Sequence, residues 1–209
     1  MKAPSIFIAI CAMGSLAWAQ EFPGDLWHEG KVVLIDDAMI QGKIKYDLQN
    51  DLVQINASNQ IQTYSARKIH YFDIFDETVK STRTFYALPF KVQVNYEVPI
   101  LFEVLYEGKL SLLCREELVT ESMQAINPYM PYSYYPGYGG NRQRLSYKYY
   151  FLYEGGEIIE YFMKKGDLIQ FFRRKQQEVK HYIKKNNLKH DRMRDLVRIT
   201  AYYNALLGS

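Results

Sequence analysis

Short segments of alternating polar and apolar residues fill the chain between residues 31 and 115, and they constrain its fold more than any other feature. In GKIKYD, residues 42–47, isoleucine and tyrosine alternate with charged residues, which is typical of a sheet with one face toward solvent. Turn residues such as Ser58-Asn59 separate the segments, and no helical period between them provides parallel crossovers. The sequence therefore predicts an antiparallel β region over residues 20–118, a meander that curls into a small barrel or a strongly bent sheet.

Two later segments resemble each other and predict further hairpins in the same antiparallel system. VLYEGKLSLL at 104–113 and FLYEGGEIIEY at 151–161 share Leu-Tyr-Glu-Gly, with β-forming residues on both sides. A glycine in each turn can adopt the positive φ that tight hairpin turns require. The first segment lies at the end of the β region, and the second predicts a separate hairpin over residues 146–163.

The apolar period changes from two to about 3.6 in residues 164–209, which predicts a helical hairpin there. Four apolar residues recur at helical spacing after the candidate N-cap Asp167, namely Leu168, Phe172, Val179 and Ile183. A second helix is expected to start near Asp191 and to end at Gly208. Its apolar face consists of Met193, Leu196, Val197 and Tyr203. We expect this stripe to pack on the sheet or on the partner helix, so the predicted fold class is α+β.

Residues 1–19 have the three parts of a secretory signal peptide. Lys2 precedes an almost wholly apolar run over residues 6–16, and Ala17-Trp18-Ala19 places small residues at the two positions that a signal peptidase recognises. The run is shorter than the roughly 20 residues needed to cross a bilayer. We expect cleavage after Ala19 and export to the periplasm or the cell surface of a Gram-negative bacterium. An amphipathic or buried N-terminal helix is the alternative.

The cysteines indicate neither a lipid anchor nor a disulfide. A lipoprotein cysteine follows a small residue at the end of the apolar core, whereas Ile10 precedes Cys11 and the core continues beyond it. Signal cleavage leaves Cys114 alone, so no intramolecular disulfide can form. Cys114 alternates with leucines in LSLLCRE and is expected to be a small buried hydrophobe. No later apolar run is long enough to cross a membrane, so we expect a soluble or peripherally attached mature chain.

Two segments resemble parts of uncharacterised exported proteins of Bacteroidetes-type bacteria. Residues 30–74 place a strand, a polar turn and G-x-I before a hairpin and a final strand, an order that resembles the SH3-like arrangement of those proteins. Residues 164–206 are similar to a C-terminal helical segment of the same family. The resemblance implies export, an SH3-like half at about residues 28–76 and a helical C-terminus, but it implies no known function and no catalytic or ligand position. The tyrosine-rich insertion departs from the family pattern.

No group of residues has the spacing of a catalytic or metal-binding site. The four histidines include no H-E-x-x-H pair, and P-loops, nucleophile elbows and dinucleotide fingerprints are absent from the sequence. His28 beside Glu29 could ligate a metal or move a proton, but its place at a strand start favours an ordinary turn contact. Asp36-Asp37 and Glu116-Glu117 are neighbours, which point to opposite faces of a strand. We expect no enzyme activity and no cofactor; a site assembled from scattered residues is the alternative.

Charge is segregated along the chain. Residues 164–198 contain twelve Lys or Arg and four Asp or Glu, and the mature chain before them has a net charge of about −6. The basic segment can attract lipid headgroups, acidic glycans or an acidic protein, whereas export makes nucleic acid an unexpected partner. Docking of a solvated helix face on the acidic β region of the same chain is the alternative. The candidate contacts with an anionic surface are Arg173, Arg174, Lys175, Lys184 and Lys185.

Residues 119–145 are rich in tyrosine, proline and glycine. Three prolines and three glycines within NPYMPYSYYPGYGG prevent regular backbone hydrogen bonding, so we expect an irregular loop after a connector, EELVTESMQA, that is compatible with a short helix. Tyrosine rings can stack on sugars or anchor a protein contact, and arginines can add cation–π or anion contacts. A low-complexity spacer is the alternative. The candidate contact residues are Tyr129, Tyr132, Tyr134, Tyr135, Tyr138, Arg142 and Arg144.

Together these features predict an exported, envelope-associated binding or assembly protein whose partner is an envelope protein or glycan of unknown identity. One alternative is a carbohydrate-binding or carbohydrate-processing protein that uses the tyrosine-rich loop. Another is peripheral attachment to an anionic surface through the basic C-terminal helices.

Overall fold

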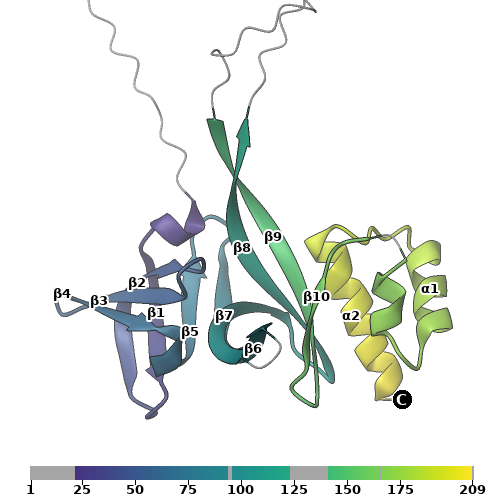
Figure 1. The fold of residues 1–209 in the computed structure, drawn as a ribbon, viewed down its shortest axis with the longest axis horizontal. Coiled ribbons are helices and arrows are strands. Elements are labelled where there is room, and N and C mark those ends of the chain that lie inside the picture. Colours follow the sequence, from purple (N-terminus) through teal and green to yellow (C-terminus); the bar gives the residue numbers. More distant parts are fainter. Residues whose placement is uncertain (1–21, 94–95, 123–140, 165, 209) are drawn as a thin grey trace, which may run out of the picture.

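The computed structural model describes residues 22–93, 96–122, 141–164 and 166–208 (Figure 1). Over these residues the chain forms one sheet of ten antiparallel strands, followed by two C-terminal helices. The predicted α+β class and the antiparallel sheet are confirmed. The sheet has two end strands and is open, so the closed barrel among the expected forms is wrong.

The N-terminal strands match the alternating segments of the sequence. They are β1 (His28–Leu34), β2 (Met39–Asp47), β3 (Leu52–Ala57), β4 (Gln60–Ser65) and β5 (Ile69–Asp76). β1 pairs with both β2 and β5, and β2, β3 and β4 form a meander. Two 3₁₀ turns accompany them, η1 (Pro23–Asp25) before β1 and η2 (Ala66–Lys68) before β5. The predicted turn at Ser58-Asn59 is confirmed, with φ of 50° and 66°, as a two-residue hairpin turn requires.

The second half of the sheet is a meander of longer strands. They are β6 (Ser81–Gln93), β7 (Tyr96–Tyr106), β8 (Leu110–Ser122), β9 (Asn141–Tyr153) and β10 (Ile158–Tyr161). The order across the sheet is therefore β10-β9-β8-β7-β6-β5-β1-β2-β3-β4. β6 continues through Pro89. This proline is tolerated because β5 stops pairing at Tyr86, so the missing N–H removes no ladder bond on that side.

The long pairing of β8 with β9 corrects two predictions about the segment between them. The strands stay in register from Leu110 opposite Tyr153 to Ser122 opposite Asn141, and their outer part continues beyond the rest of the sheet as a twisted ribbon (Figure 1). EELVTES is therefore strand and not helix, because cross-strand hydrogen bonds override a weak local preference. The predicted loop at 119–145 also loses residues 119–122 and 141–145 to these strands.

The C-terminal segment contains one 3₁₀ turn and two helices, which are η3 (Leu168–Phe171), α1 (Gln176–Lys185) and α2 (Met193–Leu207). Gly208 ends α2 as predicted. The prediction that the first helix starts at Asp167 is wrong, since η3 and a turn precede α1. This irregular start allows the adjacent Phe171 and Phe172 both to contact Phe151, at ring-centroid distances of 4.5 and 6.0 Å. Among the described residues, no helix has the length and apolar character of a membrane span.

One face of the sheet carries two apolar clusters. Phe72, Phe85 and Leu101 belong to the N-terminal cluster. The second cluster joins the sheet to the helices, and it includes Leu112, Cys114, Phe151, Leu168, Phe172, Val179 and Leu196. The predicted apolar face of the helices is thus confirmed to pack on the sheet. The opposite face of the sheet has its own small cluster around Phe102, Leu113 and Tyr150.

The two glycine-containing hairpin turns differ. Gly156, between β9 and β10, has a φ of 82° as predicted. Gly108, between β7 and β8, has no positive φ and is required for another reason, because a Cβ at this position would lie 2.6 Å from Oδ1 of Asn204 in α2. That Oδ1 accepts the Leu110 N–H at 3.0 Å, and Nδ2 donates to the Leu110 carbonyl at 2.8 Å. Through these hydrogen bonds, Asn204 joins α2 to the β7–β8 turn.

We expect Asn204→Ala to lower the free energy of unfolding by about 2 kcal/mol, because the buried N–H and C=O of Leu110 lose their partner. Urea unfolding measures the change. Gln177→Ala on the exposed side of α1 is the control, with an expected change below about 0.5 kcal/mol. Equal stability of the two variants would show that the Asn204 hydrogen bonds do not hold α2 in place.

Candidate functional site

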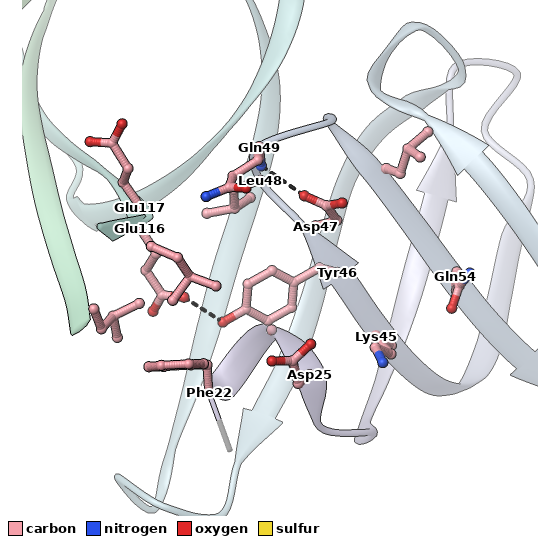
Figure 2. Close-up of a pocket in the computed structure, with 14 residues that line it drawn as sticks. Phe22, Asp25, Lys45, Tyr46, Asp47, Leu48, Gln49, Gln54, Glu116 and Glu117 are labelled. Carbon is pink, nitrogen blue, oxygen red and sulfur yellow. Dashed lines mark hydrogen bonds between the residues drawn. The ribbon is translucent and has the colours of Figure 1, made fainter. Parts of the chain in front are cut away.

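An open groove of about 390 Å³ lies between the N-terminal strands and the β8–β9 ribbon (Figure 2). η1, β2 and β3 form one side, and β8 and β9 form the other. Its apolar lining includes Phe22, Tyr46, Leu48, Leu52, Leu118 and Leu145. Its polar lining includes Asp25, Lys45, Asp47, Gln49, Gln54 and Glu117. The groove thus combines an apolar surface with a charged margin, as ligand and partner sites commonly do.

Local backbone geometry fixes the side of the groove formed by β2. Alternation along the strand buries Tyr46 and Leu48, whereas Asp47 between them is half-buried. The Asp47 carboxylate accepts the backbone N–H groups of Gln49 and Asn50 at 2.9 and 3.0 Å, which closes the turn into β3. The groove margin at this turn is therefore held by hydrogen bonds within the chain.

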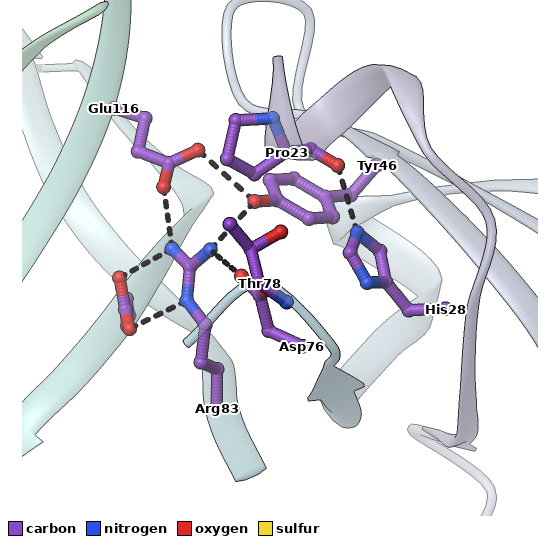
Figure 3. Close-up of polar contacts among 8 residues, drawn as sticks. Pro23, His28, Tyr46, Asp76, Thr78, Arg83 and Glu116 are labelled. Atoms are coloured by element: carbon purple, nitrogen blue, oxygen red, sulfur yellow. Dashed lines mark hydrogen bonds and ion pairs between the residues drawn. The ribbon is translucent and has the colours of Figure 1, made fainter. Parts of the chain in front are cut away.

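Arg83 of β6 lies beside the groove at the centre of a buried ionic cluster (Figure 3). Its guanidinium makes two parallel hydrogen bonds with Glu103 of β7, at 2.8 and 2.7 Å, and one with Glu116 of β8, at 2.5 Å. It also donates to Asp76 of β5 at 3.1 Å and to the Tyr46 hydroxyl at 3.0 Å. These five residues, which we name the Arg83 cluster, come from five different strands.

Every guanidinium N–H of Arg83 has an acceptor in the cluster, and the Tyr46 hydroxyl in turn donates to Glu116 at 3.0 Å. The Arg83 side chain is only 10% exposed, and its three carboxylate partners are 2–9% exposed. One guanidinium faces three carboxylates, so the cluster has an excess of two negative charges that water screens poorly. It sits on the same sheet face as the two large apolar clusters, since Phe85, Glu103 and Cys114 are register partners.

The environment of the cluster fixes the protonation of Tyr46 and Arg83. Burial raises the pKa of the Tyr46 hydroxyl far above its usual value; the Arg83 charge opposes this rise, and Glu116 adds to it. Burial alone would lower the pKa of Arg83, but hydrogen bonds and charge from Glu103 raise it instead. Tyr46 therefore remains a hydrogen-bond donor and Arg83 remains a cation across the physiological range.

A second ion pair lies on the opposite sheet face, where β8 leaves β7. Arg115 of β8 pairs with Asp51 at 2.8 Å and donates to the Leu101 carbonyl at 2.6 Å and to the Leu48 carbonyl. Asp51 also accepts the Leu101 N–H at 2.8 Å. The pair thus provides partners for backbone groups where the strand ladder ends.

The described residues contain few groups with reactive chemistry. His28 is 4% exposed and donates from Nε2 to the Pro23 carbonyl at 2.8 Å, so the predicted turn contact is confirmed. Cys114 is fully buried, as predicted, and burial raises the pKa of its thiol well above the usual value, which disfavours the nucleophilic thiolate. Within the described ranges, no three carboxylate, histidine or cysteine side chains are arranged to hold a metal ion.

The structure does not bring the predicted tyrosine-rich site together. Tyr129, Tyr132, Tyr134, Tyr135 and Tyr138 lie outside the described residues. Arg142 and Arg144 lie in β9 and are exposed. Arg144 donates to Glu121 of β8 at 2.7 Å, and both side chains are 54% exposed. An ion pair this exposed contributes little to stability.

The predicted anionic-surface residues lie around the helices. Arg173 pairs with Glu157 at 2.9 Å and lies over the Tyr153 ring at 4.0 Å, and Lys175 pairs with Glu178 at 3.4 Å. The other three are exposed, namely Arg174, Lys184 and Lys185. The helices dock on the sheet mainly through apolar residues, so most of this basic charge is left on the surface.

The sequence does not predict the groove or the Arg83 cluster, although one signal points to the cluster. Glu103 interrupts the apolar run PILFEVLY, and a carboxylate in a buried strand needs a charged partner. The partner cannot be chosen from the pattern, because the cluster joins residues as far apart in sequence as Tyr46 and Glu116. Glu116 and Glu117 have different partners as expected, since Glu116 contacts Arg83 and Glu117 contacts Lys148, but both residues line the groove.

Comparison with known proteins gives no match to a family model, to a curated protein or to a solved structure. The comparisons therefore assign no family, and the resemblance to exported proteins of Bacteroidetes-type bacteria stays a prediction.

We expect Arg83→Met to lower the free energy of unfolding by about 3–5 kcal/mol, because three buried carboxylates lose their counter-charge. Glu103→Gln in the same chain should restore part of the loss. Chemical unfolding measures both changes, with Arg67→Met at an exposed position as the control. A cost no larger than that of the control would contradict a structural role for the cluster.

Stability should depend on pH through Asp76. Burial acts to raise the pKa of this carboxyl, but the Thr78 N–H at 2.9 Å and the Arg83 guanidinium outweigh it, so the pKa lies below its usual value. The resulting stabilisation is present above the unfolded-state pKa of about 3.9 and is lost as the pH falls through the folded-state pKa.

Asp76→Asn should therefore destabilise the protein at neutral pH and flatten the loss of stability below about pH 4. Urea unfolding midpoints across this pH range measure the effect. Glu77→Gln, in the same turn but with a side chain that is 73% exposed, should leave the wild-type profile unchanged. Parallel profiles for wild type and Asp76→Asn would show that Asp76 does not titrate with folding.

Proposed function

We propose that the protein is an exported, envelope-associated binding or assembly protein that holds its partner in the groove and catalyses no reaction. One observation carries the proposal. The groove has an apolar surface and charged margins for a partner, whereas the buried polar groups beside it, Tyr46 and Glu116, are already bonded within the Arg83 cluster. These groups support the site: Tyr46 stays a hydrogen-bond donor because burial raises its pKa far above the usual value, and Glu116 is held by Arg83 and Tyr46.

The N-terminal topology supports the SH3-like half expected at about residues 28–76. The pairing order β5-β1-β2-β3-β4, with a 3₁₀ turn immediately before β5, is compatible with that arrangement. A fold class does not define a ligand, so the proposed role rests on the groove. Export rests on the signal-like pattern of residues 1–19, with cleavage after Ala19.

A second candidate role is attachment to an anionic surface through the basic C-terminal helices. The exposure of Arg174, Lys184 and Lys185 favours it, because these side chains are left on the surface when the helices pack on the sheet through apolar residues. Attachment of this kind weakens as salt concentration rises.

Site-specific photo-cross-linking in the native envelope tests the groove. A photoreactive amino acid in place of the exposed Gln49, which lines the groove, should give a discrete adduct that becomes several-fold weaker in an Asp25→Lys background. The control position is Val79, which is 60% exposed in the β5–β6 turn and outside the groove lining. Absence of an adduct at position 49, or the same products at positions 49 and 79, would contradict the proposal.

A further inference from the structure

The groove lies in a region of negative charge. The Arg83 cluster contributes three carboxylates and one guanidinium. The groove lining adds Asp25, Asp47 and Glu117 against Lys45 and the Glu117 partner Lys148. The balance is an excess of three negative charges, part of which is buried and poorly screened by water. An occupant of the groove should therefore be positively charged, with apolar stems that can cover the lining.

α1 offers a surface of that chemistry. Lys180, His181, Lys184 and Lys185 are exposed and occupy one side of the helix, opposite the buried Val179. Lysine stems cover apolar surface while the ammonium group reaches a carboxylate. Lys180 and Lys184 are also spaced i, i+4, a like-charge pair that destabilises a helix slightly unless an anion lies nearby. The exposed side of α1 therefore complements the groove, because its positive charges match the acidic residues and its lysine stems can cover the apolar lining.

The two surfaces cannot meet within one molecule. η1 and β2, which form one side of the groove, lie on one side of the β8–β9 ribbon, and α1 lies beyond its other side (Figure 1). Each molecule thus carries an acidic groove and a basic helix that face different neighbours. Charge complementarity between them favours contact between copies, since oppositely charged patches steer and orient association.

We propose that the groove of one copy receives the lysines of α1 from a second copy, in a head-to-tail contact. This inference rests on the proposed function, in which the groove is the docking site, and it identifies the partner as a second copy of the chain. Such a contact is heterologous, so each added copy leaves one groove and one helix free, and association continues into an open chain or closes into a ring. The protein is then a self-assembling component, with assembly that weakens as ionic strength rises.

Two variants with altered surface charge test the proposal by sedimentation velocity of the mature chain. The groove variant is Asp25→Lys with Gln49→Lys, and the helix variant is Lys180→Glu with Lys184→Glu; all four side chains are exposed. Wild type should form species larger than a dimer at about 0.01 M salt and dissociate at about 0.3 M. Each variant alone should associate at least about tenfold more weakly than wild type.

The decisive measurement is sedimentation velocity of the two variants mixed in equal amounts. The groove variant still has an intact helix and the helix variant an intact groove, so the mixture should form a one-to-one dimer and stop there. Formation of this dimer also shows that both variants are folded. Lys68→Glu with Lys91→Glu, the same charge change as in the helix variant but at exposed positions away from both surfaces, should assemble like wild type.

Monomeric wild type at low salt, or a mixture that forms no dimer, would overturn the inference. If wild type stays monomeric while Asp25→Lys weakens the photo-adduct formed at position 49, the groove holds a different partner; the inference then fails and the proposed function stands. If no adduct forms at position 49 even with Asp25 in place, the proposed function fails as well.

Discussion

The guanidinium of Arg83 meets three carboxylates and a phenol in a buried region, and the rest of the sheet depends on this contact. Its partners come from β2, β5, β7 and β8, so one side chain ties the N-terminal strands to the second half of the meander. Two large apolar clusters share the same sheet face, one on each side of it. A purely apolar contact could join them, but the ionic contact also fixes the direction of each partner, since a bidentate carboxylate–guanidinium pair tolerates little change in geometry.

The groove is a consequence of how the sheet divides at this point. β8 pairs with β7 only near the base and then continues with β9 alone, so the ribbon leaves the plane of the N-terminal strands. On one face of the sheet, the ion pairs of Arg83 stabilise the point where β8 leaves β7. On the other face, the ion pair of Arg115 with Asp51 stabilises it. The space that remains between β2 and the ribbon is open to a partner, and its negative charge comes largely from the residues that keep the division in place.

Local pattern predicts much of this fold. Alternation correctly predicts strand at β2 and β3, because each of them has one buried and one wet face. The stripe from Leu168 to Ile183 correctly places those residues against the core, although it cannot show that two adjacent phenylalanines need a 3₁₀ turn. The prediction of a helical connector at EELVTES is wrong because these residues pair with β9, which lies far away in sequence. The candidate site is unpredicted for the same reason: Arg83 lies in an ordinary strand segment, and only the folded sheet shows which acids surround it.

The β8–β9 ribbon also fixes where the chain leaves and re-enters the sheet. Ser122 and Asn141 are opposite each other at its end, so the link between the two strands begins and ends at neighbouring positions, about 5 Å apart. The cross-strand pairing of the ribbon, and not the sequence of the link, sets this separation.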